Sequence, residues 1–230
     1  MTSTKGTHWA NMTDEEWERY LGMEDPTYEP QRVVSHEPRQ LYFAYGSNLH
    51  VPQMKYRCPD ALQAEPGLIM GWQLVFRGVA DIEPTNDPTD RVEGGFWWVS
   101  ESDEEALDRY EGVNPHNQSN GMYRKVYFDV TLPGKSEPER CLTYLMNSQE
   151  IQPPSAGYFK TIADGYCHFR LDGSQLLAAL THSHQERSNS KRHRRAAKWK
   201  KGKLSKPVSV KAGSGLLERI RAGKILVCSR

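Results

Sequence analysis

Apolar and β-branched residues alternate with polar ones through the middle of the chain, which is the pattern of half-buried strands. The pattern predicts strands at 41–45, within 67–82, at 93–99, at 123–132 and at 140–146. Few helical segments separate these strands, and no regular strand–helix–strand rhythm or internal repeat occurs. The sequence therefore predicts an α+β domain with a largely antiparallel sheet.

Helices are expected between and after these strands. Ser102-Asp103-Glu104-Glu105 has the form of a capping box, which predicts a helix through Tyr110 that Gly112 ends. Three further helices are predicted: near 50–56, from Ser155 through Gly165, and at 174–180.

Changes in composition divide the chain into four predicted parts. Residues 1–38 lean acidic and contain three prolines after a short capped helix, which predicts a flexible leader. Residues 39–182 form the predicted folded domain. Residues 183–211 are a basic low-complexity segment, and residues 212–230 are predicted to form a short amphipathic helix and a tail.

The basic segment is most concentrated at 191–203 and leaves two interpretations open. A run of charges with few apolar residues is typical of a solvated tail. The same run could be a nuclear-import signal or a contact for RNA or another polyanion. Trp199 slightly favours a contact, because an aromatic ring can stack on a base.

Composition excludes several other classes of protein. The net charge of +1 gives no global reason to expect an acidic partner. The sequence contains no stretch of 18 apolar residues, so no membrane span is predicted. The four cysteines lack the spacing of zinc ligands. The polar, acidic N-terminus does not resemble a signal peptide, so we expect a reducing, cytoplasmic location, extended to the nucleus if the basic segment directs import.

The nonapeptide LYFAYGSNL at 41–49 is the most informative stretch. A β-favouring aromatic run stops at Gly46, which permits a positive φ and close approach of a ligand to the backbone. Ser47 and Asn48 are suited to cap a following helix. Such a turn directs successive N–H groups at one point and can cradle a carboxylate or phosphate. An ordinary strand-to-loop turn is the alternative.

Two more residues are candidates for chemistry. Glu111 follows the predicted helix at its C-terminal end, where the helix dipole disfavours a carboxylate, and a residue misplaced for stability suggests a function. Tyr158 follows a rigid Pro153-Pro154 approach that could hold its hydroxyl over a pocket. A surface glutamate and a core tyrosine are the alternatives. Asp81 and Glu83 are expected to pair with Arg77 on an exposed strand.

Five segments, in order from about residue 40 to residue 180, together resemble the γ-glutamylcyclotransferase family. They are LYFAYGSNL, GVADI followed by GGFWWV, LDRYEGV, GMYRKVYFDV and CLTYLMNSQEIQPPSAGYFKTI. The resemblance implies a small, partly open mixed β-barrel with flanking helices. It also implies an enzyme that converts a γ-glutamyl-amino acid into 5-oxoproline and a free amino acid, without a metal or an organic cofactor.

Site residues follow from the resemblance. It makes Glu111 the general acid and base, and it makes Tyr158 a contact of the substrate. The loop residues expected to bind the substrate are Tyr42, Phe43, Ala44, Tyr45, Gly46, Ser47 and Asn48. A small γ-glutamyl molecule is the expected partner, and a homodimer is left open.

Several alternatives remain at this point. The loop after Asp81 and the loop at 114–120 depart from the family pattern, which leaves the substrate open among γ-glutamyl dipeptides, glutathione, a γ-glutamyl amine and a secondary metabolite. The YGSN form and the QPPSAGY segment favour the dipeptide type. A rival from another class is a non-catalytic protein whose basic segment binds nucleic acid.

Overall fold

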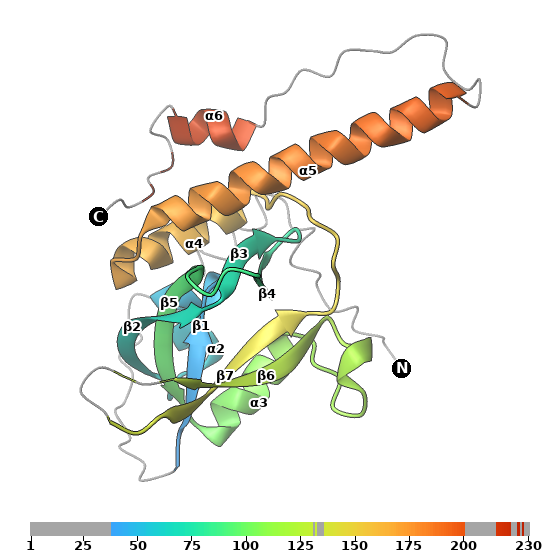
Figure 1. Cartoon of the computed structure of the whole chain (residues 1–230). Helices are drawn as coiled ribbons and strands as arrows, with labels where there is room; N and C mark the ends of the chain where they lie inside the picture. Colours follow the sequence, from blue (N-terminus) through green and yellow to red (C-terminus); the bar gives the residue numbers. More distant parts are fainter. Residues whose placement is uncertain are drawn as a thin grey trace.

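The computed structural model describes residues 38–130, 132, 136–200, 215–221, 225 and 227 of the chain. The predicted leader, and the part of the basic segment after residue 200, lie outside the described residues. Within the described part, an open five-stranded sheet is accompanied by a two-stranded hairpin and flanked by helices (Figure 1). The predicted α+β class is confirmed.

The large sheet has the strand order β2-β5-β1-β7-β6. Its strands are β1 (Gln40–Ala44), β2 (Leu62–Met70), β5 (Arg91–Val99), β6 (Tyr123–Val130) and β7 (Glu139–Met146). All neighbours are antiparallel except β1 and β7, which run parallel. The hairpin pairs β3 (Trp72–Phe76) with β4 (Ala80–Pro84). Strand β1, which leads into the GSN turn, is therefore the middle strand of the sheet.

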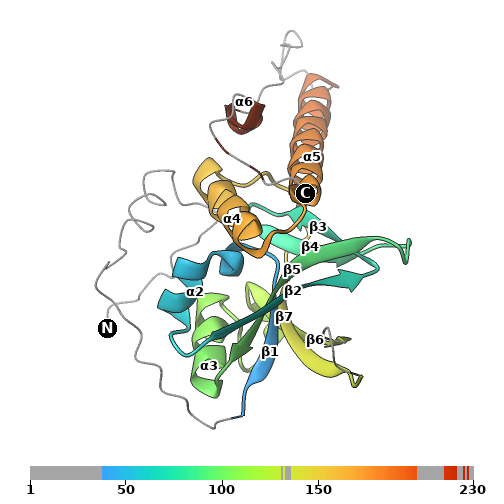
Figure 2. The same cartoon turned by 90° about the vertical axis from the view of Figure 1, so that its left-hand side faces the viewer.

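The described helices surround this sheet. They are η2 (Ser47–Leu49), α2 (Val51–Arg57), α3 (Glu101–Tyr110), η3 (Gln118–Asn120), α4 (Ala156–Phe169), α5 (Gly173–Lys200) and α6 (Gly215–Arg221). In Figure 2, α2 and α3 lie together on one side of the sheet, and α4 lies beside the start of α5. No helix of the described part is long and apolar enough to cross a membrane.

The capping box of α3 lies two residues before the predicted one. The Ser100 hydroxyl accepts from the Asp103 N–H at 3.2 Å, and the Asp103 carboxylate accepts from the Ser100 N–H at 3.3 Å. The reciprocal pair satisfies two N–H groups at the helix start. As predicted, α3 ends before Gly112, whose φ of +64° lets the chain turn away.

Helix α5 starts as predicted but does not end near Leu180. Leu176, Leu180 and Ser183 are fully buried, whereas Arg187 through Lys191 are exposed. The backbone stays helical through Lys200, because residues 184–200 contain no glycine or proline. Once the first turns are anchored, the unfavourable nucleation step is over, and each added residue forms one more backbone hydrogen bond. The first part of the basic segment is thus helical.

Arg77 pairs with Asp81 and Glu83 as expected, but the expected exposure is wrong, because the Arg77 and Asp81 side chains are buried. Arg77 Nε lies 2.8 Å from Asp81 Oδ2, with 2% and 3% of the two side chains exposed. The hairpin folds back against β7, and the Met146 N–H donates to Asp81 Oδ1 at 3.0 Å. A buried pair persists where such additional hydrogen bonds satisfy the carboxylate.

The described cysteines differ in their state. Cys58 and Cys141 are buried and free. Cys167, on α4, is disulfide-bonded.

Candidate active site

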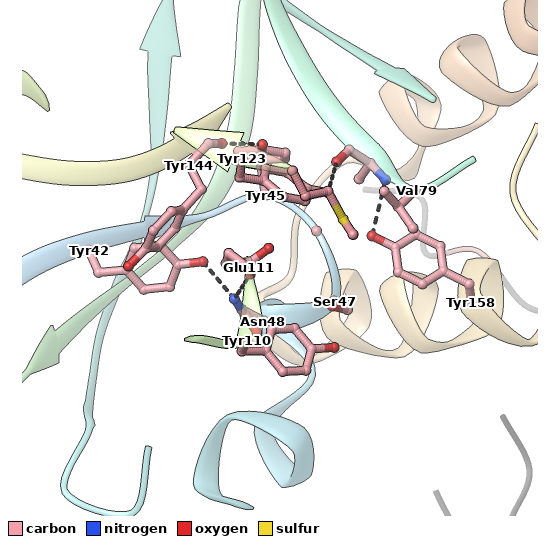
Figure 3. Close-up of a pocket in the computed structure, with 13 residues that line it drawn as sticks. Tyr42, Tyr45, Ser47, Asn48, Val79, Tyr110, Glu111, Tyr123, Tyr144 and Tyr158 are labelled. Atoms are coloured by element: carbon pink, nitrogen blue, oxygen red, sulfur yellow. Dashed lines mark hydrogen bonds between the residues drawn. The ribbon is translucent and has the colours of Figure 1, made fainter. Parts of the chain in front are cut away.

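A pocket opens where the end of β1 meets the C-terminal end of α3, the start of β4 and the first turn of α4 (Figure 3). Aromatic side chains dominate its lining. The lining residues are Tyr42, Tyr45, Gly46, Ser47, Asn48, Val79, Ala80, Tyr110, Glu111, Met122, Tyr123, Tyr144 and Tyr158.

The fold brings together most of the residues singled out in the sequence. Glu111, Tyr158 and five of the loop residues line the pocket, although they come from three distant parts of the chain. Phe43 and Ala44 are not among the lining residues. Phe43 is fully buried and packs its ring on Phe96, with 5.3 Å between the centroids. Successive strand side chains face opposite sides of a sheet, so Tyr42 and Phe43 cannot both face the pocket.

The GSN turn differs from the predicted one. Gly46 has a φ of −117° rather than a positive φ. A glycine suits this position because it has no side chain. A Cβ there would lie 3.3 Å from Ala80 Cβ and 3.4 Å from Tyr158 Oη. Ser47 and Asn48 lie inside η2 and do not cap it. The first hydrogen bond of η2 joins Leu49 N to Gly46 O, so the N–H groups of Ser47 and Asn48 precede the bonded part of the helix.

Glu111 is the C-cap residue of α3, and its carboxylate turns into the pocket. Asn48 Nδ2 donates to Glu111 Oε1 at 3.1 Å and to Tyr42 Oη at 2.7 Å (Figure 3). Burial raises the pKa of Glu111 to about 7, although the Arg57 charge and the Asn48 hydrogen bond act in the opposite direction. A carboxyl group with such a pKa can both accept and donate a proton near neutral pH.

The tyrosines supply neutral polar groups. Tyr158 Oη accepts from the Ala80 N–H at 3.0 Å, and Tyr123 Oη donates to the Ala80 carbonyl at 3.4 Å. The Tyr45 hydroxyl donates to the Tyr144 carbonyl. Burial raises the pKa of each of these phenols, which keeps them protonated.

Sequence reasoning missed Tyr110, Met122, Tyr123, Tyr144 and the Val79–Ala80 pair in the lining. It also missed Arg57, which donates to Ser47 Oγ at 3.3 Å from behind the pocket. A tyrosine within a strand pattern has the same sequence signature whether it packs in a core or lines a pocket. The β6–β7 pairing brings Tyr123 and Tyr144 to the site, and the packing of α2 brings Arg57 there.

The pocket therefore combines a carboxyl group whose pKa is raised to about 7 with an amide, backbone N–H groups and phenol hydroxyls. In the described part of the chain, no three His, Cys, Asp or Glu side chains gather as metal ligands. A concave site with a few convergent polar groups and a carboxyl group of raised pKa is typical of an enzyme that acts on a small molecule.

Comparison with known proteins gives the family. Residues 42–164 match the model of the family described as gamma-glutamyl cyclotransferase, AIG2-like, and the chain belongs to this family. The gamma-glutamylcyclotransferases of Bos taurus and Homo sapiens are each 33% identical to it over 138 residues, which cover 54% of this chain and 69% of theirs. The chain is therefore a cyclotransferase, which is a lyase.

A solved structure named gamma-glutamyl cyclotransferase has the same fold. It is 25% identical, with a TM-score of 0.51, and the match covers 80% of this chain and 99% of that chain. The flanked, open sheet described above is thus the fold of the family, as the resemblance implied.

Proposed function

We propose that the pocket cyclises γ-glutamyl-amino acids to 5-oxoproline and releases the free amino acid. The observation that carries this proposal is the Glu111 carboxyl, which lies in the pocket with a pKa of about 7 and is held against η2 by Asn48. Such a group can take a proton from an ammonium and return it to a departing amine near neutral pH.

The reaction is intramolecular. The α-amine of the γ-glutamyl group attacks its own γ-carbonyl carbon, a C–N bond forms, and the bond from that carbon to the leaving nitrogen breaks. Glu111 accepts the proton that the attacking nitrogen loses and gives it to the leaving nitrogen, so the enzyme ends unchanged. The nucleophile belongs to the substrate, so no protein nucleophile is needed. The γ-acyl group passes from one nitrogen to the other without a change of oxidation state, so no redox cofactor is needed.

Binding must hold the substrate in a folded conformer, because the gain of an intramolecular reaction depends on orientation. The N–H groups of Ser47 and Asn48 are suited to bind the α-carboxylate or the oxyanion that develops on the γ-carbonyl. The Tyr158 hydroxyl, fixed by the Ala80 N–H, orients the substrate from the opposite side of the turn.

Incubation of the purified protein with γ-glutamyl-alanine, followed by quantification of 5-oxoproline, tests the proposal. Glu111→Gln should lower the rate by about 10²–10⁴-fold, the usual contribution of a general acid or base. Glu105→Gln is the matched control, because the Glu105 side chain is 68% exposed on the same helix. Equal rates in the wild type and Glu111→Gln would refute the role of Glu111.

A γ-glutamyl amine is the second candidate substrate. Among the described residues that line the pocket, Glu111 is the charged one, and none is a lysine or arginine that would pair with the carboxylate of a leaving amino acid. Parallel assays with glutathione and an uncharged γ-glutamyl amide separate these substrates. A clear preference for the uncharged amide would mean that a γ-glutamyl amine, and not a dipeptide, is the substrate. If no substrate gave product, the non-catalytic alternative would be favoured.

A further inference from the structure

Arg57 lies behind the pocket, at the last position of α2, and has only 8% of its surface exposed. Its Nη1 donates to Ser47 Oγ at 3.3 Å and to Asn48 Oδ1. Its Nη2 donates to Gln53 Oε1 at 2.8 Å and to Tyr110 Oη. One guanidinium thus joins η2, α2 and the last turn of α3, which are the elements on either side of Glu111.

The contact with Arg57 fixes which way the Asn48 amide points. A guanidinium can only donate hydrogen bonds, so the amide oxygen of Asn48 must face it. The amide nitrogen then faces the other way, toward Tyr42 and Glu111 (Figure 3). A flipped amide would place two donors against each other at Arg57 and an oxygen against the Glu111 carboxylate.

We propose that Arg57 is a positioning residue of the cyclotransferase site: it sets the orientation of the Asn48 amide and, through it, holds the Glu111 carboxylate in place. The catalytic role of Glu111 on which this depends rests on the proposed function. Arg57 is not among the residues that line the pocket, so it acts on the substrate through lining residues: Ser47, Asn48 and Tyr110, to which it donates, and Glu111 beyond Asn48.

The charge of Arg57 acts on Glu111 as well. The titratable groups that face Glu111 from the elements around it are Tyr42 and Tyr45 at the end of β1, Cys58 after α2, Tyr123 on β6, Tyr144 on β7 and Tyr158 on α4. Burial raises the pKa of each of them, so they stay neutral near pH 7. Among the described residues, Arg57 is therefore the charge that lowers the pKa of Glu111 against the effect of burial.

The test compares three variants of the full chain with the wild type: Arg57→Met, Arg57→Lys and Gln53→Met. Gln53→Met is the matched control, because it removes one buried acceptor of Arg57 and leaves the bond to Asn48. The first readout is the pKa of Glu111 without substrate, from the ¹³C shift of its carboxyl, assigned with Glu111→Gln. The second is the acid limb of the pH profile of kcat/KM.

We expect Arg57→Met to raise the pKa of Glu111 by about 1 unit or more and to move the acid limb the same way. Arg57→Lys keeps the charge but loses the planar fork, so it should shift the pKa less and lower kcat by about 10-fold with little change in KM. Gln53→Met should leave the pKa and the limb unchanged while lowering the thermal midpoint. An unchanged pKa in folded Arg57→Met, or an equal shift in Gln53→Met, would overturn the proposal.

Arg57→Lys decides the question if Arg57→Met does not fold, as judged by near-UV circular dichroism. A wild-type kcat in that variant would then contradict the positioning role. The carboxyl titration needs no turnover. If the wild type forms no 5-oxoproline, the proposed function fails, whereas the titration still supports or refutes the link between Arg57 and Glu111.

Discussion

The Glu111 carboxyl is subject to two opposed influences. Burial favours its neutral form, while Arg57 and the Asn48 amide favour the anion, and the pKa that results is about 7. The residue therefore changes its charge in the range where a general acid and base is most effective. The same balance has a thermodynamic consequence for the free protein, because an ionised carboxylate in this pocket is less stable than one in the unfolded chain.

The stability of the wild type should accordingly fall as the pH rises through the window from about 4.5 to about 7. In that window the folded state binds the Glu111 proton and the unfolded state does not, so the contribution is complete below the window and lost above it. Glu111→Gln removes this pH-dependent contribution. The free energy of unfolding of Glu111→Gln minus that of the wild type should therefore increase by up to about 3 kcal/mol from pH 5 to pH 8.

Urea unfolding of both proteins at pH 5 and pH 8 measures this difference. Glu105→Gln serves as the control, since its carboxylate is exposed and should show no such gain. The same pH dependence in the wild type and Glu111→Gln would contradict the raised pKa.

The residues of the site differ in how far the sequence alone could identify them. Glu111 could be found because a carboxylate is misplaced at the C-terminal end of a helix, and the structure places it at that cap. Arg57 could not, because a basic residue in the last turn of a helix is favoured by the dipole and therefore carries no functional signal. Phe43 lies within the LYFAYGSNL motif, but strand alternation turns its side chain away from the pocket.

At the scale of elements, strong local patterns predict the structure best. Helix α4 after Ser155, helix α3 before Gly112 and the strand of β1 follow the sequence expectations, because caps and alternation are local properties. Helix α5 continues beyond its predicted end. The prediction relies on apolar residues, and the second half of the helix has few of them. Its length depends instead on the absence of helix breakers and on the anchored first turns.

Leu180→Ala should therefore lower the free energy of unfolding by about 2–5 kcal/mol, because the side chain is fully buried where α5 meets the domain. Thr181→Ala is the neighbouring control. Its side chain is exposed, and among the described residues its hydroxyl bonds the Leu177 carbonyl of its own helix, so the change should stay within about 0.5 kcal/mol. Chemical denaturation measures both, and equal losses would show that α5 is not anchored through Leu180.

At the scale of the whole molecule, the pocket and the core are one structure. The middle strand β1 pairs with β7, although Phe43 and Thr143 are 100 residues apart in the sequence, and the Thr143 hydroxyl donates to the Phe43 carbonyl at 2.8 Å. The sequence predicted a largely antiparallel sheet and did not show which strands are neighbours. Strand pairing between distant segments depends on how the whole chain closes, which no local pattern records.

Because residues of β1, α3, β4, β6, β7 and α4 all line the pocket, the site cannot form before the sheet does. We expect cyclisation activity and tryptophan fluorescence to be lost at the same urea concentration, as in a two-state transition. Loss of activity at a clearly lower concentration would show that the pocket opens before the core unfolds.

The reach of α5 beyond the rest of the domain also affects how the molecule moves in solution (Figure 1). At about 1.5 Å of rise per residue, the 28 residues of the helix extend over about 42 Å. The first turns pack on the domain and the second half projects, so the particle has more friction than a sphere of its 26.3 kDa mass and leaves a sizing column early. An early elution volume would therefore imitate a homodimer, and light scattering, which weighs the particle independently of its shape, is the measurement that separates the two.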